Sequence, residues 1–198
     1  RKDVIIPDRI QDQDIIVGIS SSGKSNYESL PYNSGIGSNG FTLARHALLR
    51  HDYLLKFPEC INSEVEETTS YFGSHLLQDL LPKSSITIGE ALLSPTRTYA
   101  PIVKDLFQHD KSEIHAIFHN TGGGQTKCLK FGENLHYVKD NLFPVLPIFQ
   151  LIHDSGQIPW KEMYRVFNMG HRLEVICSSA YARDHVIPTC SKYGVEAK

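Results

Sequence analysis

Three consecutive glycines, Gly122 to Gly124, are the residues of this chain best suited to bind an anion. They follow Thr121 and come soon after the apolar segment 114–118. Because glycine has no Cβ, the chain can adopt positive φ there and bring successive N–H groups close to a phosphate or a carboxylate. A tight turn between a strand and a helix that binds nothing explains such a triplet equally well. The neighbouring segments must distinguish the two interpretations.

A second glycine-rich region lies in two parts, at residues 18–23 and 35–40. The first part follows the apolar run 15–17, and the second leads into segment 41–50, whose apolar residues recur at helical spacing. Ser38 or Asn39 is therefore expected to be the N-cap of that helix. An anion at this end would meet free N–H groups and a favourable helix dipole. A cap without a ligand is the alternative, but two such loops in one chain favour an anion site.

Arg97 is the charged side chain whose position attracts attention. It stands between Thr96 and Thr98, just before a segment with helical character. Its guanidinium could hold a phosphate or carboxylate bidentately, or serve equally well as a surface salt bridge or a clamp on carbonyl groups. The ten histidines and four cysteines show neither His-Glu-x-x-His nor paired Cys-x-x-Cys spacing. No metal site is expected from them, and the cysteines are expected to be reduced thiols.

Composition excludes several classes of protein. The 198 residues are 40% hydrophobic and 21% charged, which is typical of one ordinary globular domain. A formal net charge of -2 without a dense run of Lys and Arg argues against a nucleic-acid or anionic-membrane partner. No apolar run approaches the ~20 residues that span a bilayer, so a cytoplasmic protein is expected.

Strand-like and helix-like segments interleave along the chain. Strands are expected at 4–6, 15–19, 114–118, 136–139 and 172–177, and residues 195–198 look like the start of another. Helices are expected at about 41–55, 64–81, 99–108, 125–135, 145–153, 160–167 and 179–193. Residues 24–34 lack periodicity and look like an inserted loop. The pattern predicts an α/β or α+β fold with a mixed sheet flanked by helices.

With these motifs in place, the sequence resembles the C-terminal domain of the phosphoribosylformylglycinamidine cyclo-ligases, also called aminoimidazole ribonucleotide synthetases. The resemblance covers nearly the whole chain and rests on the motifs at 18–23, 38–41, 93–99, 119–124, 133–135 and 162–170. The glycine-rich loops are shared with a wider superfamily, but Pro-Thr-Arg-x-Tyr at 95–99 and Met-Tyr-x-x-Phe-Asn-Met-Gly at 163–170 single out the cyclo-ligases. The resemblance implies an α+β fold of the α/β sandwich type, with 1–198 as a single C-terminal domain.

The chain departs from the family pattern in two ways. Residues 24–37 form an insertion, and Gly37 stands where the usual pattern x-His-Ser-Asn-Gly has a histidine. The N-terminal domain, which in the family carries most ligands of ATP and Mg²⁺, is absent from this sequence. The resemblance thus implies half of an active site, an isolated chain without activity, the N-terminal ATP-binding domain as partner and a homodimer in the full-length enzyme.

The family reaction closes the imidazole ring of formylglycinamidine ribonucleotide in purine biosynthesis. ATP phosphorylates the formyl amide oxygen, the amidine nitrogen attacks, and phosphate leaves, so that 5-aminoimidazole ribonucleotide and ADP are formed. On this reading the small-molecule substrate is held through its ribose phosphate by Ser22, Gly23, Ser38, Asn39 and Gly40, with Asn168 as a further substrate-binding residue. Thr121, Gly122, Gly123 and Gly124 face the phosphates of substrate or nucleotide, and His119 is the one candidate for proton transfer.

Alternatives to these roles stay open. His119 could merely hydrogen-bond to the glycine loop, and Asn168 could belong to a helix-ending turn closed by Gly170. Arg172, just beyond that turn, could reach the same cleft, but no role is assigned to it. The whole chain could also be a non-catalytic phosphate-binding or scaffold domain. It could equally be another superfamily member, namely a formylglycinamidine synthetase, a selenophosphate synthetase or a thiamine-monophosphate kinase.

Overall fold

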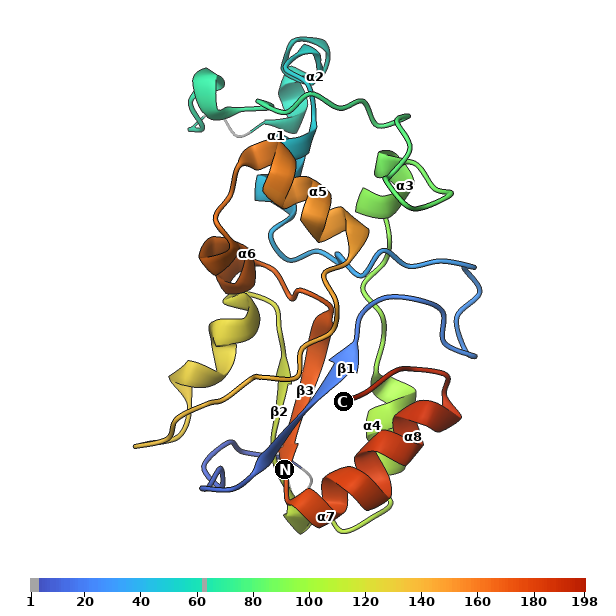
Figure 1. The fold of residues 1–198 in the computed structure, drawn as a ribbon, viewed down its shortest axis with the longest axis vertical. Coiled ribbons are helices and arrows are strands. Elements are labelled where there is room, and N and C mark those ends of the chain that lie inside the picture. The colour runs from blue at the N-terminus through green and yellow to red at the C-terminus, as the bar shows by residue number, and fades with distance from the viewer. Residues whose placement is uncertain (1–3, 62–63) are drawn as a thin grey trace.

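The computed structural model describes residues 4–61 and 64–198, and it shows an elongated molecule with two lobes (Figure 1). The lower lobe holds the strands β1 (Ile15–Ser20), β2 (Ile114–His119) and β3 (His171–Cys177) and the helices α4 (Ala100–Leu106), α7 (Ser179–Tyr181) and α8 (Ile187–Lys192). The upper lobe holds α1 (Phe41–Leu48), α2 (Asp52–Lys56), α3 (Ile88–Leu92), α5 (Pro147–Gly156) and α6 (Trp160–Val166). Short 3-10 helices lie at Pro58–Cys60, Glu67–Thr69, Lys111–Glu113 and Gly124–Lys130, and a π-helical stretch, Ala182–Val186, joins α7 to α8.

The sheet has the order β1-β3-β2, and both neighbouring pairs run antiparallel. Val175 in the central strand faces Val17 on one side and Ile117 on the other. The α+β fold class is thus confirmed, whereas the expected mixed sheet is antiparallel throughout the described residues. Ala197 pairs with Ile19 in the antiparallel sense, so the C-terminal residues do align with the outer edge of β1.

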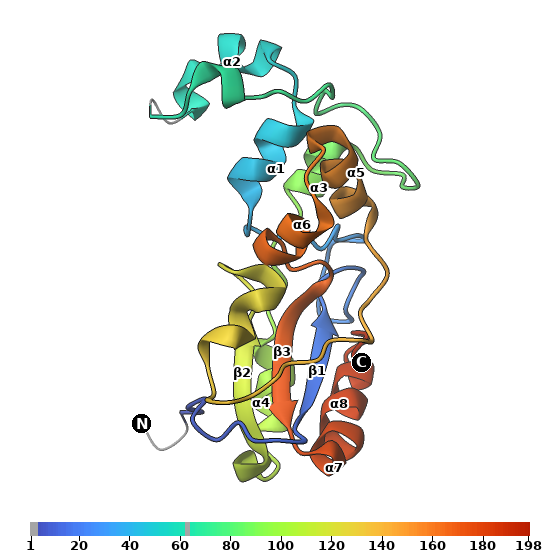
Figure 2. The same ribbon diagram turned by 60° about the vertical axis from the view of Figure 1, so that its left-hand side comes forward.

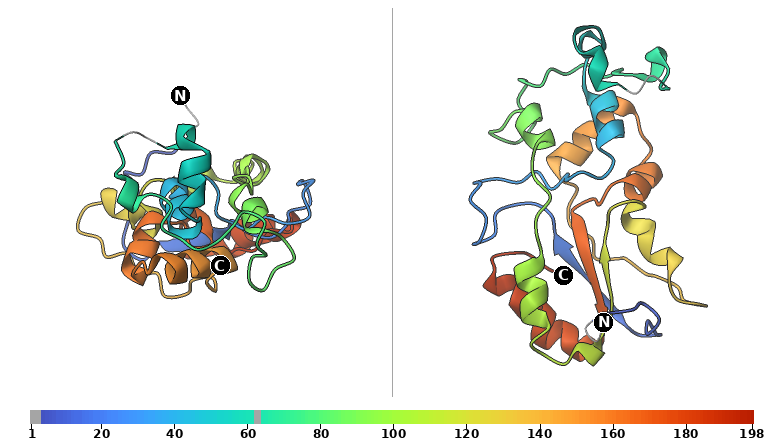
Figure 3. Two further views of the ribbon diagram at one scale, coloured as in Figure 1. Left: turned by 90° about the horizontal axis from the view of Figure 1, so that it is seen from above. Right: turned by 180° about the vertical axis from the view of Figure 1, so that it is seen from behind.

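Apolar side chains cover both faces of this sheet. Tyr99 and the helices α4, α7 and α8 pack on one face, against Val17, Ile19, Leu173 and Val175. Figures 2 and 3 show α4 and α8 side by side on that face, while the chain between β2 and α5 crosses the other. There Phe118 stacks on Phe131 at 4.8 Å between ring centroids. The three strands are therefore a fixed platform, whose upper end meets the loops described below.

The upper lobe has its own core, built from α1, α3, α5 and α6. Its members include Ala44 and Leu48 of α1, Ile88 of α3 and Phe149 of α5, all of them fully buried. Phe149 packs on Phe167, just after α6, with ring centroids 5.6 Å apart. Because Phe167 directly precedes the turn into β3, this core fixes the helical lobe against the end of the sheet.

Several expected elements differ in the structure: the helix expected at 125–135 is a 3-10 helix at Gly124–Lys130, and those expected at 41–55 and 179–193 are divided. Residues 4–6 and 136–139 form no strand, and 64–81 is irregular except for Glu67–Thr69. Gly73 gives the physical reason for the last difference, because a Cβ there would lie 2.2 Å from the backbone of Leu48. Gly73 and His75 instead pair with the chain that leaves α1, through isolated parallel bridges. None of the helices in 4–61 and 64–198 is long and apolar enough to cross a membrane.

The core of the upper lobe allows a direct test. Replacing the fully buried Phe149 by alanine (Phe149→Ala) removes a ring from this core, and we expect the free energy of unfolding to fall by about 3–5 kcal/mol. Leu55→Ala in α2 is the control, because Leu55 is 70% exposed and should change it by less than about 0.5 kcal/mol. Urea denaturation followed by circular dichroism measures both. Equal losses would contradict the packing described here.

Candidate anion-binding site

The loop that follows β1 has no free backbone donors. Each amide of residues 20–23 donates within the protein: Ser20 to the carbonyl of Glu196 (2.9 Å), Ser21 to Gly170 (2.9 Å), Ser22 to the Ser20 hydroxyl (3.2 Å) and Gly23 to Asn33 (3.1 Å). A phosphate bound by bare amides needs unpaired N–H groups. The backbone amides of Ser22 and Gly23 are thus already bonded within the protein, to acceptors that the sequence did not reveal, and a role of these residues in holding the substrate phosphate stays a prediction.

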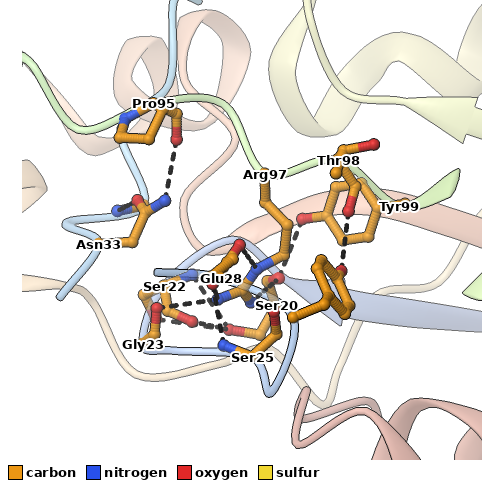
Figure 4. Close-up of polar contacts among 12 residues, drawn as sticks. Ser20, Ser22, Gly23, Ser25, Glu28, Asn33, Pro95, Arg97, Thr98 and Tyr99 are labelled. Carbon is orange, nitrogen blue, oxygen red and sulfur yellow. Dashed lines mark hydrogen bonds and ion pairs between the residues drawn. The ribbon is translucent and has the colours of Figure 1, made fainter. Parts of the chain in front are cut away.

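Arg97 is the side chain that closes this loop (Figure 4). Its Nε and Nη2 donate to the two carboxylate oxygens of Glu28 at 2.7 and 2.9 Å, and its Nη1 and Nη2 donate to the carbonyls of Ser20 and Gly23 at 3.0 and 2.8 Å. The Tyr99 hydroxyl donates to the same Ser20 carbonyl at 2.9 Å. Of the interpretations of Arg97, the structure thus shows an ion pair combined with a carbonyl clamp. Its hydrogen bond holds the pKa of Glu28 below the usual value.

The insertion 24–37 is tied down along its length and returns to where it began. The Tyr27 hydroxyl donates to the carbonyl of Thr98 at 2.7 Å, and the Asn33 amide donates to that of Pro95 at 2.8 Å. At its end, a Cβ on Gly35 would lie 2.7 Å from Oγ of Ser21. The two glycine-rich parts of the sequence therefore meet in space.

The side chain of Asn168 connects the two glycine-rich parts. It is fully buried, its Oδ1 accepts from the Ser21 hydroxyl (3.0 Å) and the Gly170 amide (2.9 Å), and its Nδ2 donates to the carbonyls of Gly35 (3.0 Å) and Ile36 (3.2 Å). An asparagine side chain has two donor hydrogens and two acceptor positions, so all are used. Asn168 thus positions the loops through side-chain polar atoms that are all bonded within the protein, and its role in substrate binding stays a prediction.

Unpaired amides occur instead where the insertion enters α1. Gly40, with φ 70°, is the N-cap and makes no side-chain cap, contrary to the expected cap by Ser38 or Asn39. The side chain of Asn39 is engaged elsewhere, since its Nδ2 donates to the carbonyl of Val166 and its Oδ1 accepts from the amide of Gly122 at 2.7 Å. Residues 37–40 form a turn, and among the described residues none of the N–H groups of 37–43 makes a well-formed hydrogen bond. Ser38 is exposed, and Asn39 and Gly40 are half-buried.

The second string of unpaired amides begins inside the glycine triplet, at Gly123. Gly122, Gly123 and Gly124 have φ of 66°, 109° and 49°, so the expected positive φ is confirmed at each. The amide of Thr121 bonds to the carbonyl of His119, and that of Gly122 to Asn39, but residues 123–125 have no acceptor in the described part of the chain. The bond from Gly122 to Asn39 joins this string to the start of α1. The two strings form one surface, which we call the amide cradle (residues 37–43 and 121–125).

Positive charge accompanies the cradle. Lys127, which the sequence interpretation overlooked, donates from Nζ to the carbonyls of His119 (2.9 Å) and Thr121 (3.0 Å). His119 ends β2 and lies half-buried beside the ring of Tyr99, with centroids 6.4 Å apart. Burial, with the charges of Arg172 and Lys127, lowers the pKa of His119 below its usual 6.5. Its imidazole is therefore neutral at pH 7 and can accept a proton.

The Arg97–Glu28 pair predicts a pH dependence. Since the folded protein lowers the pKa of Glu28, the ionised carboxylate stabilises the fold above its unfolded pKa near 4.5, and this contribution disappears as the pH falls through the lower folded-state value. Glu28→Gln should lower the free energy of unfolding by roughly 1–3 kcal/mol at pH 7, and by much less at pH 3. Urea denaturation of both proteins across this range measures the difference.

Glu162→Gln is the matched control for that measurement. Glu162 pairs with Arg165 on the surface at 3.7 Å, and both side chains are largely exposed. We expect its loss to change the stability by less than about 0.5 kcal/mol at either pH. A loss for Glu28→Gln that is the same at pH 3 as at pH 7 would show that the carboxylate charge does not hold the loop.

Comparison with known proteins places the chain in a family, although no family model matches it. It is similar to phosphoribosylformylglycinamidine cyclo-ligases of Methanopyrus kandleri (35% identical over 99% of this chain and 45% of the relative), Methanocaldococcus jannaschii (31%, over 100% and 47%) and Enterococcus faecalis (32%, over 86% and 40%). The chain thus spans about half the length of the curated relatives it matches. The chain belongs to the phosphoribosylformylglycinamidine cyclo-ligase family.

Proposed function

We propose that the chain is the C-terminal half of an ATP-dependent cyclo-ligase and binds the phosphorylated substrate of imidazole ring closure. The observation that carries this proposal is the amide cradle, in which two strings of unpaired N–H groups are joined through Asn39 and Gly122. Such amides bind phosphate well, and those at the start of α1 also benefit from the helix dipole. The family relationship supplies formylglycinamidine ribonucleotide as the substrate.

In this proposal each part of the cradle has its own task. Ser38, Asn39 and Gly40 hold the ribose phosphate, and Thr121 to Gly124 face the phosphates of substrate or nucleotide. ATP, when bound, supplies the phosphoryl group that activates the formyl oxygen. The chain mainly positions charge, because phosphoryl transfer is favoured by in-line placement and by donors aimed at developing negative charge. The neutral imidazole of His119 is available to take a proton from the attacking amidine nitrogen.

Magnesium has no ready-made set of protein ligands in the described part of the chain. The described part of the structure contains no cluster of three or more His, Cys, Asp or Glu side chains that could hold a metal ion. Mg²⁺ is usually held by one or two carboxylates together with water and phosphate oxygens. We therefore propose that the carboxylate ligands of Mg²⁺ and most contacts to ATP come from an N-terminal ATP-binding domain. We also propose that the full-length enzyme is a homodimer and that it is located in the cytoplasm.

The proposal predicts binding without turnover. The isolated chain should bind formylglycinamidine ribonucleotide by calorimetry, yet form no aminoimidazole ribonucleotide when ATP and Mg²⁺ are added. Ring closure should appear when the N-terminal half of a relative is added or fused. Turnover by the isolated chain would contradict the half-site, and binding that never leads to turnover in any complete enzyme would favour the non-catalytic alternative.

A matched pair of glycine variants tests the triplet. Gly122 (φ 66°) and Gly194 (φ 68°) have almost the same backbone conformation, and an added Cβ would meet nothing closer than 3.8 Å at either position. Gly122→Ala should weaken binding of formylglycinamidine ribonucleotide about tenfold, or ~1.4 kcal/mol, because the strained residue moves the neighbouring amides. Gly194→Ala carries similar strain outside the cradle and should leave the affinity unchanged. Equal effects would remove the triplet from the site.

A substrate panel separates the proposed enzyme from its superfamily relatives. In the complete enzyme, consumption of ATP should depend on formylglycinamidine ribonucleotide and not on selenide or thiamine monophosphate. ATP consumption with either of these compounds alone would assign the chain to another member of the superfamily.

A further inference from the structure

Arg172 is a buried cation that has no counter-ion among the described residues. It lies on β3, is 1% exposed, and is among the largest fully buried side chains. By contrast, the buried Arg97 pairs with Glu28 at 2.7 Å, and the half-buried Lys139 pairs with Glu174 at 2.5 Å. No acidic side chain in 4–61 or 64–198 forms an ion pair with Arg172. Burial of an unpaired guanidinium is unfavourable, so this charge is expected to serve a purpose.

The donors of Arg172 are only partly used. Nη2 donates to the carbonyl of Ile36 at 2.5 Å, whereas Nη1 is buried and has no hydrogen-bond partner. The backbone N–H of the neighbouring Asn120 donates to the carbonyl of Arg172 at 2.6 Å. The side-chain Oδ1 of Asn120 is buried and also has no partner. Native proteins rarely leave buried polar atoms unsatisfied, so an unpartnered buried donor calls for an explanation, such as a bound ion. The pattern indicates that something outside this chain completes the environment of the guanidinium.

Gly37 places the guanidinium beside the amide cradle. A Cβ on Gly37 would lie 1.6 Å from Nη2 and 2.5 Å from Cζ of Arg172. This explains why glycine stands where the family pattern has a histidine, because Arg172 already fills the space of any side chain at 37. Gly37 begins the string of unpaired amides, and its neighbours Ser38 in sequence and Thr96 in space are both exposed. The guanidinium thus lies directly beneath Gly37, close to the exposed residues Ser38 and Thr96.

We propose that Arg172 is a binding residue of the cradle, whose guanidinium neutralises a phosphoryl group held by the amides of residues 38–40. Because the guanidinium is buried, it acts on the anion mainly through its charge, which is permanent. The described groups that face it electrostatically are the phenol of Tyr99 and the imidazole of His119, neither of which is an anion at pH 7. This inference rests on the proposed function and deepens it, because it names the charged group that the loops themselves lack.

The test is calorimetric binding of two probes, inorganic phosphate and ribose 5-phosphate, to the 198-residue chain. Arg172→Gln removes the charge and should weaken binding of both about tenfold or more, whereas Arg172→Lys keeps the charge and should stay within a few-fold of the unaltered chain. Arg165→Gln, at an exposed arginine paired with Glu162, is the control and should change nothing. Tighter binding of ribose 5-phosphate identifies a sugar phosphate as the ligand, and equal binding identifies a phosphate group alone.

A second measurement serves if Arg172→Gln does not fold. In the unaltered chain, bound phosphate should raise the pKa of His119 in an NMR titration, because an anion beside Arg172 stabilises the imidazolium form. Phosphate binding that is unchanged in Arg172→Gln, or that leaves His119 unaffected, would overturn the role of Arg172 and leave the cradle standing. A chain that binds neither probe would overturn the cradle and the proposed function as well.

Discussion

The buried amide of Asn168 is the interaction on which the upper end of the molecule depends. Its four hydrogen bonds connect the end of β1, the return of the insertion and the turn into β3. Because each of these segments is irregular, their backbone groups could not be satisfied by helix or sheet ladders alone. The amide therefore replaces regular structure at the junction of the two lobes. The residues after Gly35 reach α1 from a fixed starting point.

The proposed binding site lies where the backbone amides are no longer paired within the protein. The loop after β1 is closed by Arg97, Glu28 and four internal acceptors, so it serves as a rigid wall. The amide cradle beside it keeps its donors, and Asn39 holds its two halves together without occupying them. Lys127 and Arg172 add positive charge at its base. A site of this kind is preorganised, because donors that are already fixed need no reorganisation when an anion arrives.

The sequence identified the main elements and the unusual backbone, because both depend on local chemistry. Apolar periodicity located all three strands and α5, and the triplet had positive φ as expected from glycine. The predictions from sequence failed where a hydrogen bond depended on residues far away in the chain. Ser22 and Gly23 have free amides until Asn33 is placed beside them, and Asn39 would cap α1 were Val166 and Gly122 not within reach. The environment of Arg172 is likewise set by Gly37, 135 positions earlier in the chain.

We propose that unpaired amides, rather than glycine-rich loops in general, form the anion site. This proposal can be tested by recording the amide chemical shifts of the isotope-labelled chain during titration with ribose 5-phosphate. We expect large saturable shifts for the amides of 38–43 and 123–125, and small ones for 20–23, whose donors are already bonded. Shifts concentrated in 20–23, or scattered over the surface without saturation, would contradict it.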